Sequence, residues 1–335
     1  MEVNGYTIEP GANLEGVDLE GVSLVDAKLW GANLTGANLS GANLSGASLR
    51  EVDLRGANLE GAALADAYLV LANLKGTNLK DADLQRAALG SSKLTDANLE
   101  SANLSEAHLT NTDLTGANLA GALLVTANLM HSNFTGANLN GADLRDSVAL
   151  GANFTNANLT DTNLTAANLV DAILNGANLK GAKLTGADLR EANLPNANLK
   201  GDYVYLDVGT LGAANLKGAN LEGADLKGKL LNRANLAGAN LAGAKLIFVN
   251  LTDADLTNAD LTNAKLMIAH LYNANLTSAN LTGANLERSN LELANLTNAN
   301  LTDANLTEAL VRDANVKDAI CTNGTQLSGV VAWRE

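Results

Sequence analysis

The sequence predicts an all-β solenoid with four-sided coils, and three observations lead to that prediction. A leucine recurs every five residues from Leu14 onward, in units such as Ala-Asn-Leu-Thr-Gly at residues 32–36. Between Leu14 and Val316 there are 61 such units, and leucine occupies the centre of 56 of them. The residue before each centre varies with a longer period of 20 residues. A repeat of this kind determines the architecture of a chain before any single residue does.

The five-residue period excludes a helical repeat. Five residues of α-helix advance a side chain by about 140° around the axis, so successive leucines would not share one face. Within one unit, however, the Ala and the Leu are two residues apart and lie on the same side of an extended segment. The Asn between them points outward, and the last two residues favour a turn. Each unit is therefore expected to be a short strand followed by a corner, with Ala and Leu inside.

The 20-residue period sets the number of sides. Units that are four apart, and so 20 residues apart in sequence, are assigned to the same side. The four sides obtained in this way begin with Leu14, Leu19, Leu24 and Leu29. Asn or Asp precedes the centre in 14 of 16 units on the side of Leu14 and in 15 of 15 on the side of Leu19. The counts fall to 8 of 15 on the side of Leu24 and 5 of 15 on the side of Leu29. This segregation predicts four sides per coil, and we call the side of Leu29 the variable side.

With these repeats the chain resembles the pentapeptide-repeat family over residues 12–318. The resemblance implies a right-handed quadrilateral β-helix, and only the resemblance implies its handedness. At 20 residues per coil the repeats would form about 15 coils. Adjacent coils are expected to pair as parallel strands about 4.8 Å apart.

The repeat is interrupted once, where seven residues separate Leu199 from Leu206. Two extra residues therefore lie within residues 200–205. They form either a tolerated bulge at a corner or a small protrusion in which Tyr203 and Tyr205 offer contact area. The assignment of later units to sides assumes that this insertion replaces no unit.

Both ends of a solenoid require covering, because an open coil exposes strand edges and apolar interior. Residues 1–11 are expected to cap the first coil, and residues 319–335 to close the last one. The tail is alternatively a homodimer contact, with Trp333 as its anchor.

Composition narrows the possible environments and partners. The net charge of −14 opposes direct nucleic-acid binding, which requires a basic surface. No apolar run approaches the length that spans a membrane, and no signal peptide is visible, so a cytoplasmic location is expected. The single cysteine, Cys321, falls at a repeat centre and is expected to be buried.

The sequence contains no recognisable catalytic constellation. It has three histidines, and none lies beside a serine or cysteine in a context typical of a nucleophile. Glycine-rich matches fall at the repeat period and indicate corners. We therefore expect no enzyme activity, no cofactor and no metal site.

The variable side is the most informative surface, because apolar and aromatic residues replace Asn there over many coils. Exposed residues of this kind, aligned along one side, favour protein binding. The open alternatives are relaxed constraint on this side and coverage by the terminal segments. The outward residues that carry the prediction are Trp30, Tyr68, Leu71, His108, Met130, His270 and Tyr272.

A second group of apolar residues lies on the neighbouring side, which contains Leu24. Ile247 and Phe248 precede Met267 and Ile268 by one coil. We call these four residues the Phe248 patch and expect it to contribute to the same binding surface.

The leading hypothesis is thus a non-enzymatic interaction protein, a rigid acidic rod whose decorated face binds an unidentified protein partner. The alternative comes from the resemblance: some pentapeptide-repeat proteins mimic DNA, bind DNA gyrase and modulate it. The acidic charge fits this alternative. We call the sides of Leu14 and Leu19 the Asn-rich sides. Lysines also occur on these two sides and weaken the DNA-mimic alternative: Lys75, Lys80, Lys180, Lys200 and Lys217.

Overall fold

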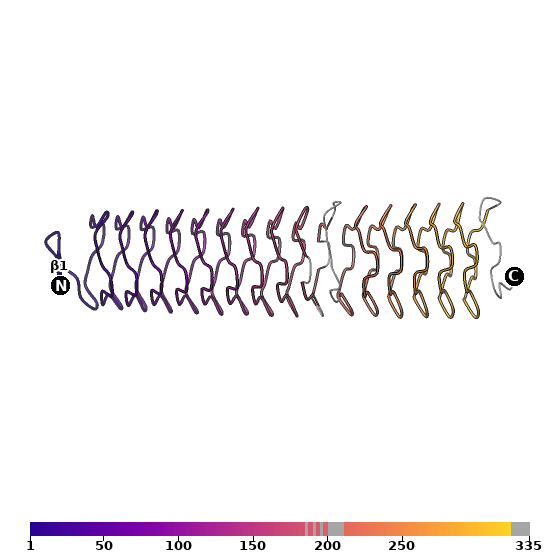
Figure 1. Cartoon of the computed structure of the whole chain (residues 1–335), viewed down its shortest axis with the longest axis horizontal. Helices are drawn as coiled ribbons and strands as arrows, with labels where there is room; N and C mark the ends of the chain where they lie inside the picture. Colours follow the sequence, from indigo (N-terminus) through magenta and orange to yellow (C-terminus); the bar gives the residue numbers. More distant parts are fainter. Residues whose placement is uncertain (185–186, 190–191, 195–196, 200–210, 323–335) are drawn as a thin grey trace. The chain divides into compact units, whose positions relative to one another are not determined.

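The chain divides into two compact units, Met1–Asn168 and Leu169–Glu335. Figure 1 shows each unit as a stack of similar coils. The computed structural model describes residues 1–184, 187–189, 192–194, 197–199 and 211–322.

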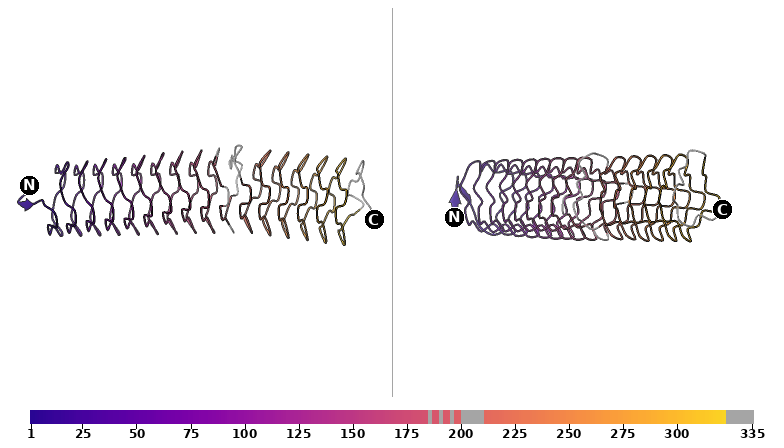
Figure 2. Two further views of the ribbon diagram at one scale, coloured as in Figure 1. Left: turned by 90° about the horizontal axis from the view of Figure 1, so that it is seen from below. Right: turned by 45° about the vertical axis from the view of Figure 1, so that its right-hand side comes forward.

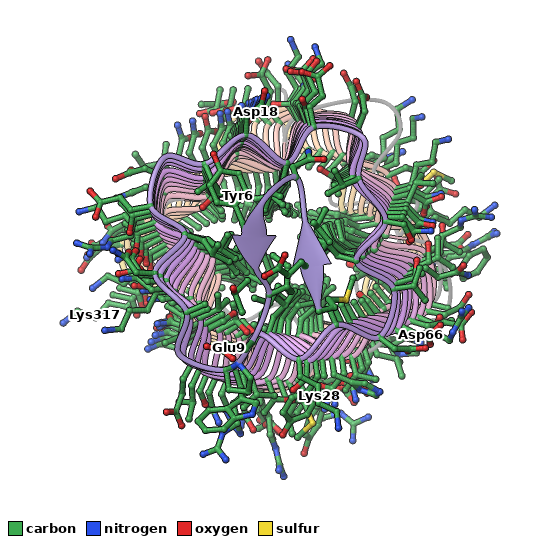
Figure 3. All side chains as sticks on the ribbon, turned by 90° about the vertical axis from the view of Figure 1, so that its left-hand side faces the viewer. Tyr6, Glu9, Asp18, Lys28, Asp66 and Lys317 are labelled. Atoms are coloured by element: carbon green, nitrogen blue, oxygen red, sulfur yellow. The ribbon has the colours of Figure 1, made fainter. Side chains whose placement is uncertain are left out.

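The N-terminus begins with a small antiparallel hairpin. Strand β1 (Glu2–Val3) pairs with strand β2 (Tyr6–Thr7). The two residues between them, Asn4 and Gly5, have φ values of 52° and 81°. Positive φ at both positions and an Asn-Gly sequence are typical of a type I′ turn. In Figure 3 the hairpin lies across the open end of the first coil, and Ile8, which follows it, is buried.

The rest of the described chain contains no helix and pairs through isolated parallel bridges. In the first unit the bridges join residues 20 apart, as in Asn13 with Asn33 and Asp18 with Asn38. Four such rows of bridges run through the unit, and their first residues are five apart in sequence: Asn13, Asp18, Ser23 and Lys28. Figure 2 shows the same succession of turns from two further directions. Four short sides per 20-residue coil are therefore confirmed within each unit.

Hydrogen bonds between coils use the backbone on both sides of each strand. Asn33 donates its N–H to the carbonyl of Ala12 in the coil before, at 2.9 Å. Leu34 donates to the carbonyl of Asp53 in the coil after, at 2.7 Å. Each coil is thus held by its two neighbours, as in a parallel sheet.

Two further backbone N–H groups donate hydrogen bonds at the corners. Ala32 donates to the carbonyl of Leu29 at 3.0 Å, and Gly31 between them has a φ of 68°. A four-residue turn with positive φ at its third residue is typical of type II and favours glycine there. At the next corner the N–H of Thr35 is bound by the side-chain oxygen of Asn33, at 3.1 Å. Only a residue whose side-chain oxygen can accept this N–H makes the bond, which explains why Asn and Asp dominate the outward position two residues earlier.

The interior consists mainly of the Ala and Leu of each repeat, which are buried in nearly all of the described coils. Each buried leucine contributes roughly 1.5–3 kcal/mol through removal from water. The rings of Phe134 and Phe154 replace two of these leucines and stack on each other. The interior is filled by side chains, so any binding site must lie on the outside.

Among the described bridges of the second unit, the spacing changes at one place. Asn193 pairs with Asn215, and Asn198 with Asn220, which are offsets of 22 residues. From Asn215 the offset returns to 20. Two extra residues therefore lie between these coils, and the later units keep their side. The predicted contact residues Tyr203 and Tyr205 lie outside the described residues.

The C-terminal predictions have mixed outcomes. Cys321 was expected to be buried, and that prediction is wrong because the side chain is exposed. No described coil follows residue 322 to cover it. Partial burial still raises the pKa of its thiol. Trp333, the predicted dimer anchor, lies outside the described residues, so the homodimer stays a prediction.

Candidate protein-binding surface

The variable side of the first unit is a continuous row of outward residues. Parallel bridges connect Lys28 to Ser48, Ser48 to Tyr68, and so on to Asn168. Trp30 follows the first of these strands and is 54% exposed, and Tyr68 is 45% exposed two coils later. In Figure 3, Lys28 marks this flank, while Asp18 and Asp66 project from other flanks of the unit. The structure therefore brings Trp30 and Tyr68 to one side of the unit.

A surface hollow lies between these two aromatic residues. Its volume is about 390 Å³, and it is lined by Trp30, Ser48, Arg50, Glu51 and Tyr68. Ser48 is small and occupies the coil between the two rings, which leaves room above it. Arg50 and Glu51 form an ion pair at 2.8 Å at the edge of the hollow. Two exposed rings beside a polar pair resemble the anchor positions of protein interfaces.

The second unit contains a similar arrangement. A row of bridges joins Leu230, Asn250, His270, Asn290 and Leu310, which the sequence register assigns to the variable side. Tyr272 is 40% exposed beside this row. A smaller hollow of about 150 Å³ is lined by Tyr272, Glu292, Leu293, Arg312 and Asp313.

The two hollows share one chemical pattern. Glu292 pairs with Arg312 at 2.8 Å, so an exposed ring again lies near an Arg–Glu pair. The recurrence in both units indicates that the combination is a repeated feature of this surface.

The residues of the Phe248 patch lie in adjacent coils of the second unit. Phe248 donates its N–H to the carbonyl of Met267 at 3.1 Å, which places the two corners in adjacent coils. Phe248 is 49% exposed, and Ile247, Met267 and Ile268 are half-buried.

Other predicted contact residues are also accessible, to different degrees. Leu71, His108 and His270 are exposed, and Met130 is half-buried. Leu71 has a φ of 62°, a backbone conformation that a branched side chain adopts only at a cost.

One feature of the variable side was not anticipated from the sequence. An outward Asn or Asp accepts the N–H of the residue two positions later, at the corner. Where another residue occupies the outward position, that corner N–H has no side-chain acceptor. On five successive coils of the first unit these N–H groups have no hydrogen-bond acceptor among the described residues: Trp30, Arg50, Val70, Gly90 and Thr110. The low count of Asn and Asp on this side was the signal that could have predicted them.

Several charged side chains on the other surfaces form ion pairs. Asp53 accepts hydrogen bonds from the Arg55 guanidinium, which holds the pKa of that carboxyl below its usual range. The Arg86 guanidinium lowers the pKa of Asp66 in the same way. These pairs are solvated and contribute little to stability.

The described residues show neither a metal-ligand cluster nor a membrane-spanning element. No group of three His, Cys, Asp or Glu side chains gathers within this part of the chain. No helix in it has the length and apolar character needed to cross a bilayer.

Together these features define a β-helical repeat protein with an apolar-decorated outer surface. The sequence profile of the family described as pentapeptide repeats matches in eight copies. The chain therefore belongs to the pentapeptide-repeat family. The matched segments are residues 12–56, 53–90, 92–129, 127–165, 162–201, 214–253, 234–271 and 274–313.

Several solved structures are similar to this chain. HetL, a pentapeptide repeat protein involved in heterocyst differentiation regulation in the cyanobacterium Nostoc, is 34% identical, covers 66% of this chain and 88% of its own, and has a TM-score of 0.35. Rfr23 from the cyanobacterium Cyanothece is 33% identical over 33% of this chain and 90% of its own, with a TM-score of 0.33.

QnrB1, a plasmid-mediated fluoroquinolone resistance protein, is 18% identical over 61% of this chain and 88% of its own, with a TM-score of 0.36. The curated protein sequences gave no match.

Proposed function

We propose that this chain is a non-enzymatic interaction protein that binds a protein partner through its variable side and the adjoining Phe248 patch. The observation that carries the proposal is the pair of exposed rings, Trp30 and Tyr68, around one hollow. Exposing large aromatic side chains in water is unfavourable, and burying them against a partner recovers that free energy.

Rigidity of the surface supports the same conclusion. The flanking strands of Trp30 and Tyr68 are held on both sides by hydrogen bonds between coils. Anchors fixed in this way lose little conformational entropy on binding. The unpaired corner N–H groups beside them offer donors to a partner's carbonyl or carboxylate oxygens.

A comparison of tagged variants tests this function. Trp30→Ser with Tyr68→Ser removes the hollow's rings, and Phe248→Asp with Met267→Asp disrupts the patch. The matched control, Lys75→Ser with Asn140→Ser, changes two exposed residues on the Asn-rich sides. We expect quantitative affinity capture to recover a partner with the wild type and the control, and to lose it in at least one surface variant. Equal recovery by all four proteins contradicts the proposal.

DNA mimicry has less support from this structure. The net charge of −14 favours it, but cations occur on the Asn-rich sides of both units, among them Lys75, Lys80, Lys180 and Lys217. Lys200 lies outside the described residues. We expect no effect of the purified protein on DNA gyrase supercoiling at micromolar concentration. Inhibition or drug protection in that assay would establish the alternative.

We further propose that the coils wind right-handedly, as in the family's fold, and number about 15 over residues 12–318. Residues 1–11 and 319–335 are the proposed caps, and the protein is proposed to act in the cytoplasm. A crystal structure tests the handedness and the coil count. Light scattering of wild type and Trp333→Ser tests the homodimer.

A further inference from the structure

The Phe248 patch has a fixed shape that its backbone produces at a cost. Phe248 and Ile268 have φ values of 59° and 56°, in the left-handed region. This region is sterically unfavourable for an L-residue with a branched or bulky side chain. Most equivalent corners use Gly, Asn, Asp or Ser, and Leu71 and Leu293 are the other described corners where a large apolar side chain adopts this conformation. The patch therefore holds apolar side chains outward where the fold alone would favour glycine.

Hydrogen-bond donors surround these apolar side chains. Lys245 and Lys265 occupy the outward positions that are Asn or Asp in most other units. The N–H groups of Ile247 and Met267 consequently have no hydrogen-bond acceptor among the described residues. On these two coils the corner N–H groups remain available as donors, whereas at corners that follow an outward Asn or Asp the side-chain oxygen accepts the N–H.

The carboxylate closest along this row is already occupied. Asp225 accepts the N–H of Lys227 at 3.3 Å and pairs with Lys245 at 3.5 Å. Lys265 is exposed and has no carboxylate partner among the described residues. Glu287 lies one coil beyond Met267, and its carbonyl accepts the N–H of Ile268. Lys227, Lys245 and Lys265 against Asp225 and Glu287 leave a small positive excess of one charge around the patch, on a chain whose net charge is −14.

We propose that the Phe248 patch binds an acidic, apolar segment of a partner protein. Apolar side chains of the segment pack on Phe248 and Met267. Its carboxylates accept hydrogen bonds from Lys245, Lys265 and the two free corner N–H groups, because charged acceptors form the stronger bonds with such donors. This inference rests on the proposed protein-binding function and specifies the chemistry of the partner at one part of the surface. Charge complementarity favours an acidic partner over a basic one.

Methyl NMR provides a site-resolved test, because the chain has three methionines and five isoleucines. Met267, Ile247 and Ile268 report on the patch, and Met130 and Ile173 report on other surfaces. The probe is a short synthetic peptide that alternates glutamate and leucine. Two comparison peptides replace glutamate by lysine or leucine by serine, and duplex DNA serves as an anionic probe without apolar side chains.

The expected result is a shift of the three patch methyls with the glutamate–leucine peptide, while Met130 and Ile173 stay unchanged. Lys245→Glu with Lys265→Glu should weaken this binding roughly tenfold, because two attractive charges become repulsive while solvent screens both of them. Lys75→Glu with Lys93→Glu changes the net charge equally and should leave binding unchanged.

Three outcomes overturn the inference: equal binding of the lysine–leucine peptide, binding of DNA in preference to the peptide, or no shift of the patch methyls. In each case the proposed function is judged separately by the affinity capture. A lost partner in the Phe248→Asp, Met267→Asp variant together with no acidic preference would show that the patch binds a partner of different chemistry.

Discussion

Phe134 and Phe154 stack face to face inside the first unit, with ring centroids 4.8 Å apart and an interplanar angle of 8°. They occupy centre positions one coil apart, where leucine is the rule. Ala149, the smallest centre residue of the first unit, belongs to the same coil as Phe134. The small side chain of Ala149 leaves volume in the coil that the large ring of Phe134 can fill, whereas the coil of Phe154 contains no small centre residue.

Replacement of these residues should therefore show coupling. Phe134→Ala is expected to lower the free energy of unfolding by about 3–5 kcal/mol. Ala149→Leu should cost about 1–3 kcal/mol in the wild type through overpacking, and less in a Phe134→Leu background. Urea denaturation of the single and double variants measures the coupling. Strictly additive effects would show that the two residues do not share one volume.

The Asn side chains of the corners make a second, independent contribution. Asn118 accepts the N–H of Ala120 at 3.3 Å and donates its amide to Asn98 at 3.2 Å. Asn118→Ala should destabilise the protein by about 0.5–1.5 kcal/mol, because the partly exposed corner N–H loses its side-chain acceptor. Ala88→Asn should have the opposite sign and stabilise by about 0.5–1.5 kcal/mol, since it supplies an acceptor to Gly90. Thermal unfolding of both variants is the measurement, and equal signs would contradict this role of Asn.

The repeat alone was sufficient to predict four-sided coils within each unit. Ala32 and Leu34 are buried as their spacing requires, and Tyr68 lies in one row with Ser48 as the 20-residue period requires. These features follow from periodicity because every coil repeats the same backbone path.

The finer features of the surface depend on atoms that periodicity does not specify. The free N–H of Val70 follows from the absence of an Asx acceptor at Tyr68, which requires knowledge of the corner geometry. The hollow beside Trp30 depends on the small size of Ser48 and on side-chain rotamers. Cys321 was mispredicted because a repeat position implies burial only where another coil covers it.

Relief of the strained corners should separate stability from binding. Phe248→Gly and Ile268→Gly remove side chains from residues with left-handed backbone. The gain is limited to about 1 kcal/mol, because glycine also increases the entropy of the unfolded chain. The control Asn258→Gly should change stability less, since Asn tolerates the same conformation. Chemical denaturation measures the change, and a loss of more than about 1 kcal/mol in Phe248→Gly would show that the ring stabilises the fold instead.

Acid sensitivity should depend in part on Asp113. Burial alone would raise the pKa of this carboxyl, but hydrogen bonds from Thr115, Thr95 and Asn133 outweigh burial and hold the pKa below its usual range. The hydroxyl of Thr115 donates at 2.6 Å. A carboxyl whose pKa is lower in the folded state stabilises the fold at neutral pH. That stabilisation is lost as the pH falls through the folded-state pKa, below about pH 4.

Asp113→Asn should accordingly flatten the dependence of stability on pH between about pH 5 and about pH 2. Thr115→Val removes one of the lowering hydrogen bonds, so the loss of stability should begin at a higher pH than in the wild type. Thermal unfolding midpoints across this range, compared for the three proteins, provide the measurement. Parallel curves for wild type and Asp113→Asn would mean that this carboxyl ionises alike in the folded and unfolded chain.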